Sequence, residues 1–195
     1  FRLLREGLLG PDLSQSEVDG CNDILKAVDG LPLSYAAYAF ATAYHETAST
    51  MQPIKEYGGP TYFTRMYDVT GARPQTAIKY GNTCAGDGPK YCGRGYVQLT
   101  WKNNYEKAGV KCGVDLVGNP DKAMDPVIAA KVMRHGMSEG WFTGKRLADM
   151  LPASGAATFE MFRRARRIVN GTDRNAEIAV LALQFQAALA AGGWR

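Results

Sequence analysis

The most constraining feature of this sequence is one almost continuously apolar segment, residues 35–44. A helix that is apolar on all sides is buried on all sides, so we predict a central core helix here, with Ser34 as its N-cap. His45, Glu46 and Thr47 follow this segment directly. The predicted helix therefore carries a carboxyl group into the interior of the protein.

Glu46 is the first candidate for a catalytic residue. A buried carboxyl group is costly to ionise unless it is paired, so it can stay protonated near neutral pH and act as a general acid. The alternative is a structural role, in which Glu46 caps a loop or pairs with an arginine. The motifs further along the chain decide between these alternatives.

The composition is that of one ordinary globular domain, and we predict a single catalytic domain over residues 1–195. Of these residues 46% are hydrophobic, which is enough to bury a core. The net charge of +4 fits an enzyme that meets an anionic surface at least as well as a nucleic-acid binder. This charge is mild and spread out, so we expect no nucleic-acid binding. No secretory signal and no apolar run of membrane-spanning length is visible, so we expect no stable membrane insertion. The sequence does not decide whether a leader peptide preceded Phe1 and was removed.

The cysteines and histidines do not follow a metal-binding pattern. None of the four cysteines belongs to a Cys-x-x-Cys pair and the chain has two histidines, so we expect no metal and no cofactor. Cys84 and Cys92 flank a Gly-rich loop and could form a disulfide in an oxidising compartment, but the sequence leaves their state open. Cys21 is expected to be a small core residue.

Capping signals and helical spacing predict the other helices. In the first half of the chain, helices are expected at residues 1–9, from the capping box at Ser14 and Glu17 to about residue 30, and at 101–108, where Gly109 ends the helix. In the second half, they are expected from Asp125 and Pro126 onward, at 147–151 and at 158–169, and a last helix is expected to begin after Asp173 as its N-cap. Residues 47–95 are rich in turn-forming residues and are expected to form a small irregular or β-hairpin lobe that lines a cleft. Residues 96–100 alternate like a short strand.

Glu56 is a second carboxylate, ten residues after Glu46, and it lies in the Gly-rich segment beside Lys55. Hydrolysis of a glycosidic bond needs one protonated and one ionised carboxyl group. A buried helix end and a more solvated loop provide these two different environments. The alternative for Glu56 is a solvated residue in a salt bridge with Lys55.

Several blocks of this sequence resemble, in order, those of glycoside hydrolase family 19. This family contains plant-type chitinases and the lysozyme-like endolysins of bacteriophages. The blocks are Tyr-His-Glu-Thr at 44–47, Tyr-Cys-Gly-Arg-Gly-Tyr-Val-Gln-Leu-Thr-Trp-Lys-Asn-Asn-Tyr at 91–105, Asn-Pro at 119–120 with Asp-Pro at 125–126, and Arg-Ile-Val-Asn-Gly at 167–171. The resemblance spans about residues 35–189 and implies a mainly α, lysozyme-like or chitinase-like domain whose small lobe forms the cleft.

The resemblance also implies roles for individual residues. Glu46 takes the place of the general acid, Glu56 that of the general base in the shorter, endolysin-like members, and Thr100 that of a hydroxyl that holds the attacking water. The residues expected to bind or orient around the substrate are His45, Tyr96, Gln98, Asn104 and Asn170. For His45 the expected role is to orient the acid. For Tyr96 the alternatives are a platform for a sugar ring and a core tyrosine, and Arg94 is expected to brace the loop.

Two departures from the plant pattern affect the predicted site. The base lies at a different spacing, and the arginine that plant enzymes carry on the last helix has no clear counterpart, so the pairing around the acids must differ. The basic run Arg163, Arg164, Arg166 and Arg167 is expected to be a solvated helix face, with one arginine turned inward to a carboxylate.

From these features we predict an endolysin-type enzyme that cleaves β-1,4 linkages of peptidoglycan with inversion, as a muramidase. The alternative within the fold is a chitinase. Alternatives of another class are a peptidoglycan amidase or peptidase and a non-catalytic wall-binding module. We expect a monomer that acts at the bacterial cell wall or periplasm after release from the cytoplasm through a holin-type pore. The bond that is cut, the choice between peptidoglycan and chitin, and the host organism stay open.

Overall fold

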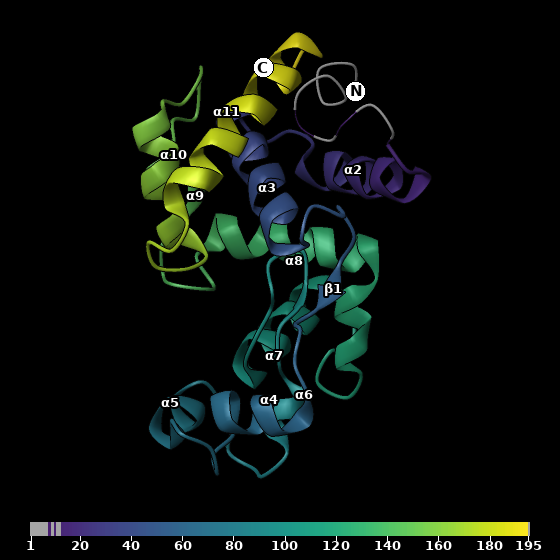
Figure 1. Ribbon diagram of the computed structural model, residues 1–195, viewed down its shortest axis with the longest axis vertical. Coiled ribbons are helices and arrows are strands. Elements are labelled where there is room, and N and C mark those ends of the chain that lie inside the picture. Colours follow the sequence, from purple (N-terminus) through teal and green to yellow (C-terminus); the bar gives the residue numbers. More distant parts are fainter. Residues whose placement is uncertain (1–7, 9, 11–12, 195) are drawn as a thin grey trace. The chain divides into compact units, whose positions relative to one another are not determined.

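The computed structural model of this chain describes residues 8, 10 and 13–194. It is mainly helical and forms two compact units (Figure 1). Unit 1 consists of Phe1–Gln52 and Met133–Arg195, and unit 2 of Pro53–Val132. The helix predicted at residues 1–9 lies almost entirely outside the described residues. The single catalytic domain stays a prediction.

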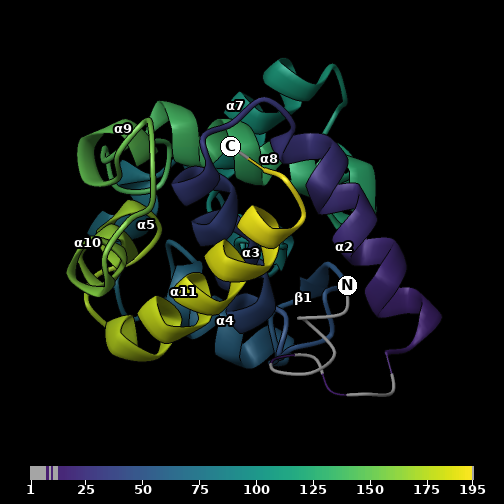
Figure 2. The ribbon, with the colours of Figure 1, turned by 90° about the horizontal axis from the view of Figure 1, so that it is seen from above.

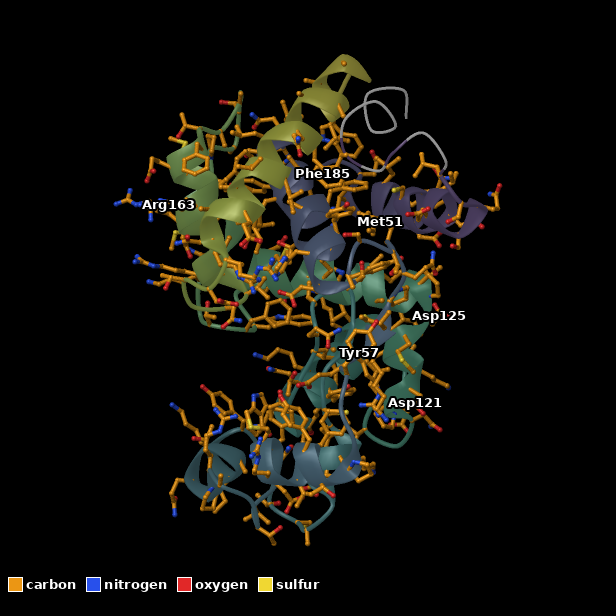
Figure 3. The ribbon with its side chains drawn as sticks, viewed as in Figure 1. Met51, Tyr57, Asp121, Asp125, Arg163 and Phe185 are labelled. Atoms are coloured by element: carbon orange, nitrogen blue, oxygen red, sulfur yellow. The ribbon has the colours of Figure 1, made fainter. Side chains whose placement is uncertain are left out.

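The predicted core helix is α3 (Leu33–Glu46), and it is the centre of unit 1. All ten residues from position 34 to 43 are buried, which confirms a helix apolar on every side. It packs against α2 (Gln15–Val28) and α11 (Asn175–Ala191), and α11 crosses it in both views (Figures 1 and 2). Phe185 of α11, which Figure 3 labels, contacts Phe40 of α3. Their ring centroids are 5.3 Å apart. The last residues of α3 are therefore held by a rigid scaffold.

The helix starts in unit 1 confirm one predicted cap and correct two. Ser14 and Glu17 form the predicted capping box at the start of α2. Ser34 is not the N-cap of α3, because the helix begins one residue earlier and the Ser34 hydroxyl donates a hydrogen bond to the Pro152 carbonyl at 2.7 Å. Asp173 does not cap the last helix either, since the chain enters α11 through the next residue in a left-handed conformation.

The rest of unit 1 follows the predicted order. The expected helix at 158–169 is instead α10 (Phe159–Ala165) followed by a 3-10 turn, η2 (Arg166–Ile168). The short helix α9 (Leu147–Met150) is confirmed. Helix α8 (Pro126–Glu139) begins at its proline in unit 2 and ends in unit 1, with the Asp125 carboxylate accepting hydrogen bonds from the first backbone amides.

Unit 2 is more helical than the sequence predicts. The segment expected to be irregular contains α4 (Pro60–Tyr67), α5 (Pro74–Lys79) and α6 (Asp87–Lys90). Helices α4 and α5 begin with proline, which is favourable at the first position because the amide there has no hydrogen-bond partner within the helix. The strand predicted at 96–100 is wrong: the only strands among the described residues are β1 (Ile54–Lys55) and β2 (Arg94–Gly95). They pair antiparallel, Ile54 with Gly95 and Lys55 with Arg94.

Two further features complete unit 2. Helix α7 (Lys102–Cys112) continues through the predicted stop at Gly109 and ends at Gly113, which has a φ of 69°. The 3-10 turn η1 (Pro120–Met124) packs on β2. Asp68 is 1% exposed; burial alone would raise the pKa of its carboxyl group, but hydrogen bonds from Thr70, Gly88 and Gly86 lower it. This ionised carboxylate ties α4 to the loop around α6.

All four cysteines are free thiols. Cys21 is a buried core residue, as predicted. Cys84 is exposed and Cys92 is buried, so the disulfide considered for them is not formed in this structure. No helix within residues 8, 10 and 13–194 has both the length and the apolar character that a membrane crossing requires.

Candidate active site

Glu46 is the last residue of α3, and a buried arginine binds it. Arg166, in η2, is 2% exposed and donates a hydrogen bond from Nη1 to Glu46 Oε1 at 2.7 Å. Its Nε donates to the Asp173 carbonyl, which fixes the guanidinium group. The Glu46 side chain is 17% exposed. Arg166 occupies one oxygen, so Oε2 is the oxygen that can carry a proton to a substrate.

The ion pair changes the environment that the sequence predicts for Glu46. Its carboxyl group is not an isolated buried acid but one partner of a largely buried ion pair. The structure confirms that one arginine of the basic run turns inward to a carboxylate, and that arginine is Arg166. Arg163 projects outward from α10 (Figure 3) and pairs with Glu160 on the surface.

His45 precedes the acid and is half-buried. Burial is the main cause that lowers the pKa of its imidazole below the ordinary value of 6.5; Glu46 opposes this shift and Arg166 adds to it. A histidine in this environment is neutral at neutral pH. Asn170 follows η2 in the same unit and is exposed. Its side-chain oxygen accepts a hydrogen bond from the Gly171 amide at 2.8 Å.

Glu56 follows β1 directly, and both of its carboxylate oxygens accept hydrogen bonds. The Tyr67 hydroxyl donates to Oε1 at 2.8 Å, and the Gly93 amide donates to Oε2 at 3.1 Å. The Glu56 amide in turn donates to the Gly93 carbonyl at 2.9 Å. The described structure contains no ion pair between Glu56 and Lys55; Lys55 lies over the Phe63 ring instead. Glu56 is therefore a fixed carboxylate that still has lone pairs for a water molecule.

Two side chains of the site lie close to Gly93, so a larger residue there would disturb them. A Cβ atom there would lie 2.7 Å from Gln98 Oε1 and 3.1 Å from Glu56 Oε2. Both distances are too short for a relaxed contact, and the Gln98 amide is itself bonded to strand carbonyls. The short β1–β2 ladder and this glycine together bring Glu56 and Gln98 to the same point.

Gln98, Thr100 and Asn104 form a hydrogen-bonded series that starts at Gln98, close to Glu56. The Gln98 side-chain amide donates to the carbonyls of Ile54 and Gly95. The Thr100 hydroxyl donates to the Gln98 carbonyl at 2.8 Å, and the Asn104 amide donates to the Thr100 carbonyl at 2.9 Å. The donors of Gln98 and Thr100 are used inside the protein, whereas Asn104 uses one of its two N–H groups, so all three side-chain oxygens have lone pairs for a ligand or a water.

Tyr96 is 0% exposed. A buried ring cannot stack on a sugar, so of the two predicted roles the structure favours the core tyrosine. Arg94 is also buried; it donates to Asp121, to Tyr105 and to the carbonyls of Lys90 and Cys92. These contacts agree with the predicted bracing of the loop.

The predicted site residues thus form two groups. Unit 1 contains Glu46, His45 and Asn170, and unit 2 contains Glu56, Tyr96, Gln98, Thr100 and Asn104. Sequence reasoning missed Tyr67, the donor to Glu56, because nothing in its spacing distinguishes it from the other tyrosines of this segment. No cluster of three or more metal-binding side chains occurs in the part of the chain that the structure describes.

Comparison with solved structures identifies the class of fold. The chain is similar to chitinase C from Streptomyces griseus HUT6037, with a TM-score of 0.63 and 19% identity over 97% of this chain and 75% of that one. The fold is therefore the mainly helical chitinase fold that the sequence predicts. The family described as Chitinase class I matches residues 34–142, more than half of the sequence. The chain belongs to this family, glycoside hydrolase family 19.

Curated relatives share shorter segments. Acidic endochitinase Q from Nicotiana tabacum is 56% identical over 93 residues, which are 47% of this chain and 30% of that protein. Endochitinase A2 from Pisum sativum is 51% identical over 49 residues, 25% of this chain and 15% of that protein. The chain thus matches less than a third of the length of either endochitinase.

Proposed function

We propose that this protein hydrolyses β-1,4 bonds between N-acetylated sugars, with Glu46 as general acid and Glu56 as general base. The observation that supports this most directly is that Glu46 and Glu56 each accept hydrogen bonds from a different set of donors. Arg166 binds Glu46 at the end of a buried helix, and Tyr67 and Gly93 bind Glu56. Two carboxyl groups in such different environments suit an acid and a base.

In the proposed reaction, Glu46 donates its proton from Oε2 to the glycosidic oxygen as the bond to the anomeric carbon breaks. Glu56 accepts a proton from a water molecule, whose oxygen attacks the anomeric carbon from the opposite face. The Thr100 hydroxyl donates to Gln98, so its oxygen can accept the second hydrogen of this water. Glu46 ends the step as a carboxylate, which the Arg166 guanidinium stabilises.

We propose a chitin-type polymer of β-1,4-linked N-acetylglucosamine as the first substrate class. The support is the family itself and the relatives named endochitinase. This reverses the order of the two substrates predicted from the sequence. The reaction needs residues of one chain alone, and we propose that the protein acts as a monomer.

Peptidoglycan is the second candidate, and the charge of unit 2 favours it. Residues 53–105 contain seven basic and three acidic side chains, a net charge of +4. All three acidic side chains accept hydrogen bonds within the unit: Glu56 from Tyr67 and Gly93, Asp68 and Asp87 from backbone amides. All of the basic side chains except Arg94, which is buried and pairs with Asp121, are partly or fully exposed, and their charge suits a glycan that carries carboxylates. For this substrate we propose action at the bacterial wall after release through a holin-type pore.

The test is to incubate the protein with chitin oligomers and, separately, with purified Gram-negative peptidoglycan, then to reduce the products and identify new chain ends by mass spectrometry. Cleaved chitin oligomers support the first candidate, and reduced muramic acid ends support the second. Proton NMR immediately after cleavage should detect the α-anomer if the configuration is inverted. New amino groups without new sugar ends would instead indicate an amidase or peptidase, and binding without cleavage a wall-binding module.

A further inference from the structure

Tyr67 is the one side chain in the described structure whose hydroxyl donates to the carboxylate of Glu56. The distance from the hydroxyl oxygen to Oε1 is 2.8 Å. Gly93 binds the other oxygen, Oε2, through its backbone amide. Together the two donors fix the plane of the carboxylate, because each defines the direction of one oxygen.

The Tyr67 ring is held on two sides. Tyr67 is the last residue of α4. Its ring stacks on Phe63 with centroids 6.5 Å apart and lies nearly perpendicular to the Trp101 ring, with centroids 5.2 Å apart. Buried Asn82 donates to the Tyr67 carbonyl at 2.9 Å and accepts from the Lys102 amide at 2.9 Å. Both the ring and the backbone are therefore fixed before any substrate binds, and the hydroxyl is preorganised toward Glu56.

The Tyr67 hydroxyl is a permanent donor. Burial is the largest cause that raises the pKa of the phenol above its ordinary value of 10.0, and the hydrogen bond to Glu56 and the charge of Glu56 raise it further. The phenol therefore stays protonated at any pH at which a glycosidase works. The Glu56 carboxylate has about four lone-pair sites and two are occupied, which leaves sites for the proton of a water molecule.

We propose that Tyr67 is a positioning residue that aligns Glu56 for proton abstraction from the attacking water. The inference rests on the proposed role of Glu56 as general base. Tyr67 itself touches neither the water nor the sugar in this scheme; it acts through the carboxylate. Loss of its hydroxyl leaves Oε1 without this donor while the packing of the ring is kept.

The kinetic test compares Tyr67→Phe with the wild type on a substrate that the wild type cleaves. Tyr67→Phe removes a hydrogen bond to a charged group, so we expect its kcat to fall about tenfold to hundredfold while KM stays almost unchanged. The matched control is Tyr91→Phe, because the Tyr91 hydroxyl is buried in the same unit but donates to the Val117 carbonyl. This control should keep the wild-type kcat. A Tyr67→Phe protein with normal kcat would overturn the proposal.

A double-mutant cycle separates action through Glu56 from a general structural effect. If Tyr67 acts through Glu56, Tyr67→Phe should cause no further loss in a Glu56→Gln background. An equal loss in both backgrounds would mean that Tyr67 acts by another route and would overturn the proposal. A fully active Glu56→Gln enzyme would instead contradict the proposed base, and with it the role that Tyr67 has in the reaction.

A spectroscopic measurement tests the contact without relying on activity. Tyrosine labelled at Cζ with carbon-13 reports each phenol by NMR, and Tyr67→Phe assigns the Tyr67 signal. In Glu56→Gln the phenol should titrate at lower pH than in the wild type, because the neighbouring charge that raises its pKa is gone. The Cζ shift at neutral pH gives the same comparison if the protein unfolds in alkali. An unchanged Tyr67 signal would show that the two side chains are not coupled.

Discussion

At the scale of single residues, the Arg166–Glu46 pair has the largest consequences. A guanidinium group that is 2% exposed needs acceptors inside the protein, and Glu46 and the Asp173 carbonyl provide them. The pair therefore has two roles, since the same carboxyl group is the proposed proton donor and the partner of a buried cation. Changing it should affect both catalysis and stability.

Glu46→Gln tests both roles. Activity should fall by orders of magnitude, because an amide cannot donate the proton that the leaving group needs. The variant should also be about 1–3 kcal/mol less stable, because Arg166 loses its charged acceptor, and its Tm should fall by several degrees. The control is Glu160→Gln, which removes the exposed partner of Arg163 on the surface and should leave Tm unchanged. An unchanged Tm for Glu46→Gln would mean that Arg166 is satisfied without the carboxylate.

His45 should make stability depend on pH. Its pKa is lowered in the folded protein, mainly by burial, so below about pH 6.5 the unfolded chain binds a proton that the folded chain does not. Stability should therefore fall as the pH drops from 6.5 toward the lower folded pKa. Urea unfolding at about pH 7.5 and about pH 5.5 should reveal a smaller loss in His45→Gln than in the wild type. An equal loss would assign the pH dependence to other groups.

The sequence predicts some of the site residues better than others, for physical reasons. Glu46 is predictable because the apolar helix before it determines where its carboxyl group lies. Thr100 is predicted through its family block, and Glu56, which lies outside these blocks, as the second carboxyl group that the reaction needs; the roles of both stay predictions. Tyr67 is not predictable, since its hydrogen bond to Glu56 joins the end of α4 to the residue that follows β1, and no local pattern records that tertiary contact.

At the scale of elements, the long helices and the short α9 were predicted, whereas the three short helices α4, α5 and α6 of unit 2 were not. Helices α2, α3 and α8 have caps or an N-terminal proline together with a repeated apolar pattern. Helices α4, α5 and α6 have eight, six and four residues, which is too short for periodicity to be visible. Tertiary contacts determine these short helices, as when Asp68 binds the loop around α6.

Gly20 in α2 allows a prediction at this scale. Alanine in place of glycine normally stabilises a helix interior by about 1 kcal/mol. A Cβ atom at Gly20 would overlap the Met51 carbonyl oxygen, which is backbone and cannot move aside. We expect Gly20→Ala to lower the free energy of unfolding by about 1–3 kcal/mol in urea titrations, whereas Asn22→Ala, on the same helix and partly exposed, should not. A stabilised Gly20→Ala protein would contradict the packing of α2 on the Met51 segment.

At the scale of the whole molecule, charge is unevenly distributed along the chain. The net charge of residues 53–105 equals that of the entire protein, +4. Exposed lysines in this segment lie over aromatic rings: Lys55 over Phe63, Lys79 over Tyr80 and Lys90 over Tyr91. Such contacts restrain the side chains while the ammonium groups stay near solvent. A flexible anionic polymer would therefore meet cations that are already ordered.

The charge distribution predicts different salt responses for the two candidate substrates. At low ionic strength the wild type should cleave or bind peptidoglycan better than at high ionic strength, whereas neutral chitin oligomers should give nearly the same rate at both. Replacing Lys55, Lys79 and Lys90 together by glutamine should lower the low-salt peptidoglycan signal roughly threefold to tenfold and leave chitin oligomer cleavage unchanged.

The matched control replaces Lys107, Lys122 and Lys131, which are exposed in the same unit but lie outside this segment. Both triple variants remove three positive charges, so net charge alone cannot distinguish them. If residues 53–105 meet the anionic glycan, only the first variant should lose the salt-dependent part of the signal. Equal losses of this signal in both variants would mean that the total charge of the protein attracts the wall. No loss in either variant would mean that the charge does not favour peptidoglycan, and chitin would stay the first candidate.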